Sequence, residues 1–565
     1  MGAIFVGARH VAPSRGAHLS ETIADLLLAR ADDDHIGLRF KDESWTWAEV
    51  LDECKVRANL LATICDATPR HVGVLLDNVP EYVFLLGGAA LAGVTVVGIN
   101  PTRRGEELAA DIRHTDCRLV VTDDEHAPLL RDLDLGMANE QVMAVASKRW
   151  LGLLESAGPA ELPSARPGPE TLFVLIFTSG STGAPKAVRA TQGRFAGLAR
   201  SMGFTPDDVL YCPMPLFHGN ALVSNLLPGM AAGATIALRQ RFSASGFLPD
   251  IRRYRATFSN TVGRALSYVL ATPPSEHDLD HRLRFVLAPE SSAADMAAFK
   301  TRFGCVVIDG YGSSEGAIKM APARRGRPGE LGQPLEGADV AVVNAVTMRE
   351  CPRALLDHDG RLLNASEAIG EIVRRDSGAS FEGYYNNPEA DAARTRNGWF
   401  WSGDLAYRDQ DGAFWFAGRS DDWLRVDGEN FAAAPVERIL LRHPDAVAVA
   451  VYAVPDPVTG DEVMAAIELR PGQDFEPERF TQFLGAQADL GTKWAPRFVR
   501  ITPSLPVTGT NKVDRRQLRA DAWRTEDDVW WRPVRGLSYH RLSSPDIEAL
   551  RASFAAHGRE TLLSP

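Results

Sequence analysis

The sequence predicts an α/β protein whose strands are largely parallel. Short apolar runs recur between about residues 40 and 310, for example at Val72–Leu76, Leu172–Phe177 and Thr235–Leu238. Segments with helical character, such as Ala48–Leu61, separate these runs. Alternation of this kind is typical of parallel sheets covered by helices. Because 565 residues exceed what one ordinary core accommodates, roughly two to four domains are expected.

Three more strands and one more helix belong to the same large N-terminal part. The strands are expected at Val94–Ile99, Leu119–Thr122 and Cys305–Ile308, and the helix at Ala293–Phe303. The longest uncharged apolar stretch, Val83–Ile99, is near the lower length limit for crossing a bilayer. Its pattern changes from helix-like to β-branched near Gly93, so we expect a buried helix followed by a core strand. No integral membrane segment is therefore expected, and a peripheral membrane contact stays open.

The C-terminal third has a different texture. From Gly370 to Gly418, short aromatic segments alternate with glycine and Asn-Gly turns, which predicts a small β-rich subdomain. The chain then turns polar, and a domain boundary is expected near Arg419–Asp422. A smaller α/β unit is expected beyond it. Its elements are helices at Pro435–Arg442 and Glu476–Ala488 and strands at Val447–Val454 and Val463–Leu469.

Composition excludes several classes of function. The net charge of −12 argues against non-specific binding to nucleic acids, which requires a basic surface. The six cysteines are scattered without a Cys-x-x-Cys pair, which favours reduced thiols over a disulfide framework. No basic region precedes the short apolar run at the start, so a signal peptide is not expected. These features favour a cytoplasmic enzyme.

The most informative segment is Phe177–Ala187, which follows a predicted buried strand. Four hydroxyl residues alternate with two glycines, and Lys186 closes the run. Glycines allow close approach of the backbone to a ligand, while N–H groups, hydroxyls and a lysine together favour an anion. Only eight lysines occur in the chain, so a lysine at this place supports an anion site. The segment predicts a triphosphate loop, with an ordinary surface loop as the alternative.

This loop is not a Walker motif. That motif requires a glycine just before its lysine and Ser or Thr just after it. Pro185 and Ala187 occupy those places here, and Pro185 would fit poorly at the start of a helix that opens there.

A second motif, Asp309–Gly316, directly follows a predicted strand. In α/β proteins, ligands gather at the carboxyl ends of strands. Tyr311 offers an aromatic face to a base, Asp309 an acceptor for an exocyclic amine, and Glu315 an oxygen for Mg²⁺. Gly312 to Gly316 also matches the nucleophile elbow of serine hydrolases, which requires a helix immediately afterwards. The residues that follow are rich in proline and glycine, so the hydrolase reading is disfavoured.

Three later motifs complete the set. In Trp399–Leu405, Asp404 follows a glycine and could accept hydrogen bonds from ribose hydroxyls, although a turn aspartate that caps its own backbone is the simpler alternative. Gly418–Asn430 lies at the predicted domain boundary. Pro506–Arg515 places Lys512 on a Gly/Asn turn, where in isolation it would be a solvated surface lysine.

In this order and spacing, the five motifs resemble the adenylate-forming superfamily of acyl-CoA synthetases, peptide-synthetase adenylation domains and luciferases. The similarity covers about residues 40 to 545 and is strongest to fatty-acid and very-long-chain acyl-CoA synthetases. Segments that support this are Ile99–Gly105, Gly383–Glu389, Asp427–Asn430 and Tyr539–Ser543. The resemblance implies a large N-terminal ATP- and acyl-binding domain (1–418), a hinge (419–421) and a mobile C-terminal lid domain (422–565) that carries the catalytic lysine.

The resemblance also implies roles for matching residues. The residues implied to bind ATP are Thr178, Ser179, Gly180, Ser181, Thr182, Gly183, Lys186, Asp309, Tyr311, Gly312, Ser314, Asp404 and Arg419. Among them, the segment from Thr178 to Lys186 would hold the β- and γ-phosphates, and Tyr311 would stack on adenine. The residues implied to be catalytic are Lys512, Glu315, Thr182 and Lys186.

Further roles follow from the same resemblance. Glu315 and Thr182 would organise Mg²⁺, and Lys512 would bridge the substrate carboxylate and the α-phosphate. Asp404 and Arg419 would bind ribose, and Asp421 would be the hinge.

Two more sites are implied, one for the acyl group and one for CoA. His218 and Gly219 would line the acyl pocket, and Gly428 would lie by the pantetheine tunnel. The sequence departs from the family at Ala288–Glu290, where relatives carry a glycine-rich turn that contacts adenine. Pro289 has no N–H group, which leaves the nucleotide contacts of this turn open.

The expected function is therefore an ATP-dependent, AMP-forming fatty-acid–CoA ligase, which converts a fatty or other apolar carboxylic acid to acyl-AMP and transfers the acyl group to CoA. A carboxylate is already ionised at neutral pH and needs no general base, so the absence of a histidine-centred triad is expected. The alternatives are a ligase that loads a carrier protein, a CoA ligase for a steroid side-chain acid, and an inactive acyl-binding protein. Chain length and oligomeric state are left open.

Overall fold

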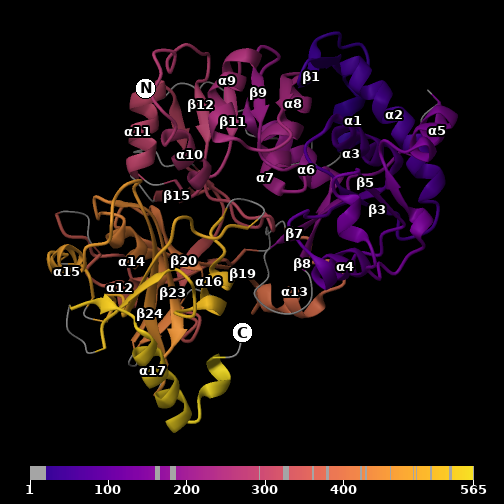
Figure 1. Cartoon of the computed structure of the whole chain (residues 1–565). Helices are drawn as coiled ribbons and strands as arrows, with labels where there is room; N and C mark the ends of the chain where they lie inside the picture. Colours follow the sequence, from indigo (N-terminus) through magenta and orange to yellow (C-terminus); the bar gives the residue numbers. More distant parts are fainter. Residues whose placement is uncertain are drawn as a thin grey trace. The chain divides into compact units, whose positions relative to one another are not determined.

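The chain forms two compact units in the computed structural model. The described residues are 21–158, 166–178, 186–291, 293–321, 330–358, 362–376, 381–419, 423–426, 429–458, 460–487, 489–491, 493–508, 512–533 and 538–563. Unit 1 comprises Met1–Ala317 and Ser380–Ala393, and unit 2 comprises Ile318–Ala379 and Arg394–Pro565. Figure 1 shows unit 1 mainly in indigo and magenta, with its helices on the faces of its sheets.

The first sheet of unit 1 has the order β13-β12-β11-β9-β10-β1-β2. All neighbours in it are parallel except β1 and β2, which pair antiparallel. Its strands are β1 (Ile36–Phe40), β2 (Glu43–Thr46), β9 (Val209–Cys212), β10 (Thr235–Leu238), β11 (Phe258–Asn260), β12 (Phe285–Leu287) and β13 (Val306–Ile308). Parallel pairing places the carboxyl ends of β9, β11, β12 and β13 along one edge.

The second sheet of unit 1 has the order β6-β5-β3-β4-β7-β8. Its strands are β3 (His71–Leu75), β4 (Thr95–Gly98), β5 (Leu119–Thr122), β6 (Val142–Ala144), β7 (Leu172–Thr178) and β8 (Lys186–Thr191). The first five are parallel, whereas β8 runs antiparallel to β7. This hairpin sets the position of the predicted phosphate loop.

Helices of unit 1 cover both sheets, and some of them begin at a residue whose side chain caps the helix. Thr46 and Glu49 form a capping box at the start of α2 (Trp47–Ile64). Nearly every residue of α3 (Pro80–Ala92) is buried, and the helix ends at Gly93 with φ of +63°, just before β4. The expected change from buried helix to core strand is therefore found at the expected glycine, where the left-handed conformation favours this residue.

The other helices of unit 1 are shorter. They are α1 (Ile23–Leu28), α4 (Gly105–His114), α5 (Lys148–Ala157), α6 (Gln192–Ala199), α7 (Gly219–Ala221), α8 (Leu227–Ala232), α9 (Ala244–Tyr254), α10 (Gly263–Leu270), α11 (Ala293–Phe303) and α13 (Pro388–Arg394). Helical turns lie at η1 (Ala127–Leu130), η2 (Asn139–Gln141), η3 (Arg200–Met202) and η4 (Leu222–Leu226), of which η4 is a π-helix. Among the described residues, no helix has the length and apolar character needed to cross a membrane.

Unit 2 contains an antiparallel sheet and a second, mixed sheet. The first has the order β14-β15-β20-β19-β17-β16, with β18 paired to β19. Its strands are β14 (Met320–Ala321), β15 (Glu330–Pro334), β16 (Val340–Val343), β17 (Gly370–Arg374), β18 (Thr395–Arg396), β19 (Trp399–Arg408) and β20 (Phe414–Arg419). The predicted β-rich segment from Gly370 to Gly418 supplies four of these strands.

The mixed sheet has the order β23-β24-β25-β26-β27, next to the hairpin β21-β22. The strands are β21 (Trp423–Val426), β22 (Glu429–Ala432), β23 (Ala446–Pro455), β24 (Asp461–Leu469), β25 (Phe498–Ile501), β26 (Asp528–Trp531) and β27 (His540–Arg541). The helices of unit 2 are α12 (Ala365–Ala368), α14 (Ala433–Leu440), α15 (Pro477–Gly485), α16 (Arg515–Asp521), α17 (Ser544–Ala556) and η6 (Glu560–Leu563).

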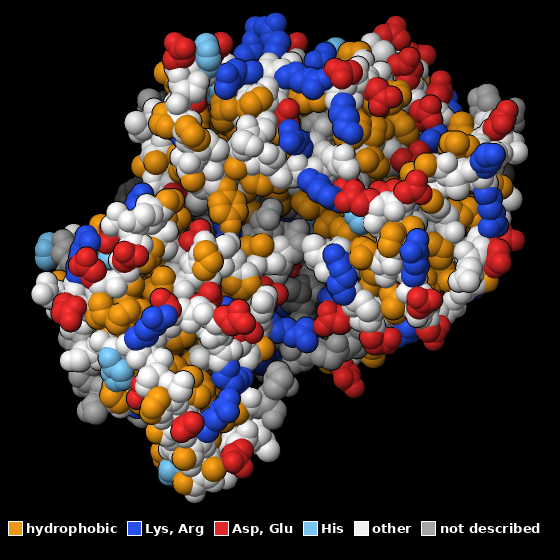
Figure 2. Space-filling model, viewed as in Figure 1, with side chains coloured by type: hydrophobic (Ala, Val, Ile, Leu, Met, Phe, Trp, Pro, Cys, Tyr) orange, Lys and Arg blue, Asp and Glu red, His pale blue; other side chains and the backbone are white. Residues whose placement is uncertain are grey.

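The predicted α/β class with parallel sheets, a β-rich part and a smaller C-terminal α/β part is confirmed. The segment Ser380–Ala393 groups with unit 1, whereas the residues that precede and follow it in the chain group with unit 2. On the face drawn in Figure 2, acidic and basic side chains are interspersed. Residues 420–422 lie outside the described residues, so the hinge stays a prediction.

Candidate active site

The two ends of the predicted phosphate loop lie opposite each other. Thr178 is the last residue of β7, Lys186 is the first residue of β8, and the two are partners in the antiparallel register. Both side chains are half-buried. The five predicted residues between them, Ser179, Gly180, Ser181, Thr182 and Gly183, lie outside the described residues. The hairpin thus presents Thr178 and Lys186 at the carboxyl end of β7.

Glu315, the predicted metal ligand, is a buried carboxylate with a defined partner. It is 7% exposed, and the hydroxyl of Tyr384 donates a hydrogen bond to its Oε1 over 2.8 Å. Tyr384 is 3% exposed and forms a backbone bridge with Val188 of β8, two residues after Lys186. A segment distant in sequence therefore holds the Glu315 carboxylate and is anchored on the strand that carries Lys186. Sequence reasoning had used Tyr384 only as part of a family motif and missed this contact.

Arg194 on α6 contacts the backbone of the same motif. Its Nη2 donates to the carbonyl oxygen of Ser314 over 2.7 Å, and its Nη1 lies 3.6 Å from Oε2 of Glu382. Burial lowers the pKa of Arg194, and Glu382 opposes this shift. Gly316 has φ of +67°, and a Cβ there would lie 2.2 Å from Nη2 of Arg194. The positive φ favours glycine at this position, and a larger residue would displace the Arg194 guanidinium.

The predicted adenine side is built around Asp309, directly after β13. Its Oδ1 accepts a hydrogen bond from the backbone N–H of Glu290 over 3.2 Å. Burial raises the pKa of Asp309 to about 6, although hydrogen bonds from the backbone of Glu290 and Gly310 act in the opposite direction. Tyr311 and Ser314 are half-buried, and Gly312 is exposed with open space at its Cβ position.

Hydrogen bonds to its carbonyl groups hold the segment Ala288–Glu290 in place. Its position therefore does not depend on an N–H group at Pro289. The N–H of Gly263 donates to the carbonyl oxygen of Pro289 over 2.8 Å. A Cβ on Gly263 would lie 2.2 Å from the carbonyl oxygen of Glu290. The backbones approach so closely that only glycine fits at 263.

The predicted acyl-pocket residues lie beside the nucleotide motif. His218 is half-buried and precedes α7, and Gly219 is buried at the start of that helix. A Cβ on Gly219 would lie 3.6 Å from Cδ1 of Ile176 on β7 and 3.7 Å from Oγ of Ser314. The acyl motif, the end of β7 and the motif after β13 therefore meet in one place in unit 1.

Asn78 fixes the backbone of the acyl motif. Its Nδ2 donates to the carbonyl oxygen of Met214 over 2.8 Å, and its Oδ1 accepts from the N–H of Leu216 over 2.8 Å. Asn78 follows β3 and is 2% exposed. Sequence reasoning missed this role, although a polar Asp-Asn pair directly after a predicted buried strand was a usable signal.

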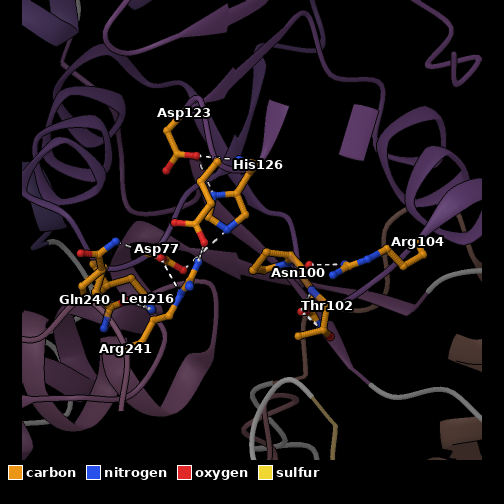
Figure 3. A network of polar contacts seen from close by, with 12 residues as sticks. Asp77, Asn100, Thr102, Arg104, Asp123, His126, Leu216, Gln240 and Arg241 are labelled. Carbon is orange, nitrogen blue, oxygen red and sulfur yellow. Dashed lines mark hydrogen bonds and ion pairs between the residues drawn. The ribbon is translucent and has the colours of Figure 1, made fainter. Parts of the chain in front are cut away.

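A charged network surrounds Asp77, which precedes Asn78 in the chain (Figure 3). Nδ1 of His126 lies 2.7 Å from Oδ1 of Asp123, and its Nε2 lies 3.7 Å from Oδ1 of Asp77. Arg241 and Gln240 reach Asp77 from the other sheet, with Nε of Arg241 2.7 Å from Oδ2 of Asp77. The network ties the two sheets together next to the acyl motif.

Asn100 and its neighbours form a separate turn after β4, which Figure 3 shows apart from Asp77. Oδ1 of Asn100 accepts from the N–H of Thr102 over 3.0 Å and from its hydroxyl over 2.9 Å. Arg104 donates to the carbonyl oxygen of Pro101, which closes the turn before α4. The Asn-Pro-Thr sequence therefore stabilises a local turn.

Unit 2 carries the remaining predicted residues. Asp404 on β19 is 4% exposed, and its Oδ1 lies 3.0 Å from Nη1 of Arg419 on β20. The predicted ribose-binding pair is thus an ion pair across adjacent strands. Lys512 is exposed and precedes Val513, which forms an isolated antiparallel bridge with Val507. Asp421 and Gly428 lie outside the described residues.

Two family models match the chain and decide its family. The model described as AMP-binding enzyme matches residues 28–385, and the model described as AMP-binding enzyme C-terminal domain matches residues 435–512. The chain belongs to the AMP-binding enzyme family. The predicted resemblance to adenylate-forming enzymes is therefore confirmed.

Named relatives of this AMP-binding enzyme are CoA ligases. The chain is 48% identical over 549 residues to steroid-22-oyl-CoA synthetase of Rhodococcus jostii, covering 96% of this chain and 99% of that protein. It is 42% identical to a medium/long-chain-fatty-acid–CoA ligase of Mycobacterium marinum, covering 92% and 99% of the two chains. The predicted acyl-CoA ligase activity is therefore confirmed. ATP and CoA fit this family as substrates.

Solved structures agree with the fold of this AMP-binding enzyme. A crystal structure of the anthranilate CoA ligase AuaEII with anthranoyl-AMP matches with a TM-score of 0.75 at 25% identity, covering 90% of this chain and 98% of that chain. A benzoate CoA ligase from Burkholderia xenovorans matches with a TM-score of 0.77 at 21% identity, covering 88% and 100%, and shows the fold alone.

Proposed function

We propose that this AMP-binding enzyme activates a bulky apolar carboxylic acid with ATP and transfers the acyl group to CoA. In the first step, a carboxylate oxygen attacks the α-phosphorus of ATP, the bond to pyrophosphate breaks, and acyl-AMP forms. In the second step, the CoA sulfur attacks the acyl carbon, AMP leaves, and the thiol proton is released to solvent. The observation that carries the proposal is the position of Gly219, which lies beside Ile176 of β7 and beside Ser314, the neighbour of Glu315, so that the acyl motif meets both nucleotide motifs in unit 1.

Different residues of unit 1 would contact the phosphates and the adenine of ATP. Lys186 and the Thr178 end of the hairpin would face the β- and γ-phosphates, because a cation and a hydroxyl both stabilise phosphate oxygens. Asp309 would accept from the exocyclic amine of adenine, and Tyr311 would stack on the ring. Gly219 would admit the acyl group beside Ser314.

Mg²⁺ fits the donor set of this site. Glu315 supplies one buried carboxylate, and protein-bound Mg²⁺ commonly uses one or two carboxylates together with substrate phosphates. We therefore propose that Glu315 and Thr182 hold the ion, which would neutralise charge on the phosphates of ATP. Among the described residues, no cluster of three or more His, Cys, Asp or Glu forms a separate metal site.

Unit 2 would supply the catalytic lysine and the ribose-binding residues. Lys512 would bridge the substrate carboxylate and the α-phosphate, and the Asp404–Arg419 pair would bind ribose. Residues 1–418 would act as the nucleotide- and acyl-binding domain, Asp421 in the hinge 419–421 as the pivot, and residues 422–565 as a lid. Gly428 would lie by the pantetheine path.

We propose a steroid side-chain acid as the substrate, with a medium- or long-chain fatty acid as the second candidate. The first rests on 48% identity to a steroid-22-oyl-CoA synthetase, and the second on 42% identity to a fatty-acid–CoA ligase. Small residues of the acyl motif, at Gly219 and Ala221, favour a wide acyl group, whereas Gly229 packs against Ile236 and Leu210 of the core and leaves no space.

The test is pyrophosphate release and acyl-CoA formation with a panel of acids, in the presence and absence of CoA. The panel contains a steroid with its carboxyl group at carbon 22, octanoic acid, dodecanoic acid and hexadecanoic acid. The proposal expects thioester formation that requires ATP and CoA, with the highest kcat/KM for the steroid acid. A higher kcat/KM for a fatty acid would select the second candidate, and no thioester with any acid would refute both.

A further inference from the structure

Three asparagine side chains and the adjoining residue Thr261, which joins them through its carbonyl oxygen, form a polar cluster behind the acyl motif. This asparagine cluster consists of Asn220, Asn225, Asn260 and Thr261. Nδ2 of Asn225 donates to the carbonyl oxygen of Tyr211 and to Oδ1 of Asn260, both over 2.9 Å. Nδ2 of Asn260 lies 3.5 Å from Oδ1 of Asn220, and Nδ2 of Asn220 lies 3.4 Å from the carbonyl oxygen of Thr261. The two contacts of Asn220 are at the limit of hydrogen-bond length and are therefore weak.

Two atoms of the cluster have unused hydrogen-bonding capacity. Asn225 is 0% and Thr261 is 1% exposed. Within the part of the chain that the structure describes, Oδ1 of Asn225 and Oγ1 of Thr261 have no hydrogen-bond partner. Buried polar groups are almost always paired, and leaving one unpaired is costly. An acceptor and a hydroxyl in one buried cluster therefore point to a polar group that is brought by a ligand.

The backbone near Asn225 has an unusual form. Asn225 lies in the π-helix η4, which interrupts the helical segment between α7 and α8. Single π turns inside α-helices occur frequently at functional sites. This turn leaves Asn225 paired with the ends of β9 and β11.

The position of the cluster is that of an acyl subsite. Asn220 directly follows Gly219, which lies beside Ser314, and Asn220 is the half-buried member of the cluster. Thr261 follows β11 and Asp309 follows β13, with β12 alone between these strands. Because neighbouring strands are about 4.8 Å apart, the cluster lies roughly 10 Å from the predicted adenine contact along the same edge.

We propose that the asparagine cluster is a binding subsite for a hydroxyl group on the acyl part of the substrate. The proposal rests on the proposed function and adds to it that the preferred acid is apolar but carries one hydroxyl. The hydroxyl donates to Oδ1 of Asn225 and accepts from the hydroxyl of Thr261. Asn220, held by two weak contacts, admits it to the cluster.

The chemistry of the two atoms predicts an order of preference. A hydroxyl group uses both the acceptor and the donor, an oxo group uses only the donor of Thr261, and a C–H group uses neither. We therefore expect kcat/KM to fall from the hydroxy acid to the oxo acid to the unsubstituted acid. The span from first to last should be about tenfold or more, because a site with buried polar groups rejects analogues that leave them unpaired.

The experiment measures acyl-CoA formation by the full chain with matched acids. One set is a saturated steroid 22-carboxylic acid with its 3-hydroxy and 3-oxo derivatives, and the other is dodecanoic acid with 12-hydroxydodecanoic acid. The variants are Thr261→Val, which keeps the shape and removes the hydroxyl, and Thr261→Ser, which restores it. Thr122→Val is the matched control, since it removes another buried hydroxyl without a partner among the described residues, on β5 of the other sheet.

We expect the unmodified protein to prefer the hydroxy acid over the unsubstituted acid. Thr261→Val should lower this preference about tenfold, while Thr261→Ser and Thr122→Val should keep it. The set of acids that shows the preference identifies the acyl class. Equal conversion of hydroxy and unsubstituted acids by the unmodified protein refutes the subsite and leaves the proposed function standing. Equal loss for both acids in Thr261→Val also refutes it, by showing a structural role. Conversion of no acid at all refutes the proposed function instead.

Discussion

Replacing Tyr384 by phenylalanine should weaken the first half-reaction at limiting Mg²⁺. The substitution removes the hydroxyl that donates to Oε1 of Glu315 over 2.8 Å. The ring keeps its edge contact with Phe381, whose centroid is 5.2 Å away. The change therefore tests the hydrogen bond and leaves the packing in place.

The size of the effect follows from the burial of this contact. Glu315 is 7% and Tyr384 is 3% exposed, so water cannot readily replace the lost donor. A hydrogen bond to a charged group contributes about 1.5–3 kcal/mol, and each 1.4 kcal/mol corresponds to a factor of ten. We expect kcat/KM for acyl-AMP formation to fall about 10- to 150-fold. The Mg²⁺ concentration for half-maximal rate should rise, because Glu315 is then less well oriented.

The assay is pyrophosphate release over a titration of Mg²⁺, with thermal unfolding of the same samples. Tyr82→Phe is the matched control, since Tyr82 is a buried tyrosine of the same unit whose hydroxyl has no partner among the described residues. Glu315→Gln should remove most of the difference between Tyr and Phe at 384, which a double-mutant cycle measures. An unchanged Mg²⁺ dependence in Tyr384→Phe, with only a lower melting temperature, would refute the positioning role of this residue.

Three further predictions concern other parts of the site. Lys512→Ala should lower acyl-AMP formation by about 100-fold or more, while thioester formation from supplied acyl-AMP survives; equal loss in both half-reactions, measured separately, contradicts the assigned role. Gly263→Ala should raise the KM for ATP, because its Cβ would lie 2.2 Å from the carbonyl oxygen of Glu290, whose N–H contacts Asp309; an unchanged KM would show that this segment does not contact the nucleotide. Burial raises the pKa of Asp309 to about 6, so this carboxylate is ionised above pH 6 and gains a proton below it. The KM for ATP should therefore rise as pH falls through about 6 in the unmodified protein, and Asp309→Asn should lack that step in a pH profile of initial rates.

Local sequence signals predicted much of the secondary structure. The predicted strands Leu119–Thr122 and Thr235–Leu238 and the predicted helix Ala293–Phe303 have these bounds in the structure. The break between helix and strand was predicted at Gly93 from the change to β-branched residues, and Gly93 has the left-handed conformation that glycine favours. Such signals depend on neighbours in the chain, so they can be read without knowing the fold.

The contacts that support the candidate site were less predictable. Tyr384 and Glu315 are separated by 69 positions, and Asn78 and Leu216 by 138. No periodicity or turn pattern indicates which distant side chains meet. The antiparallel course of β8 was likewise not anticipated, although it sets Lys186 opposite Thr178.

The sequence by itself determined the α/β class, the family and the residue types suited to an adenylate-forming reaction, because ordered motifs and local propensities carry that information. The tertiary structure decided which residues hold Glu315, what fixes the acyl motif, and that Asn225 and Thr261 share one buried cluster. The physical reason is that hydrogen bonds and burial are set by distances in space between segments far apart in the chain. The partners of a buried polar group can therefore be assigned only once the sheets are packed.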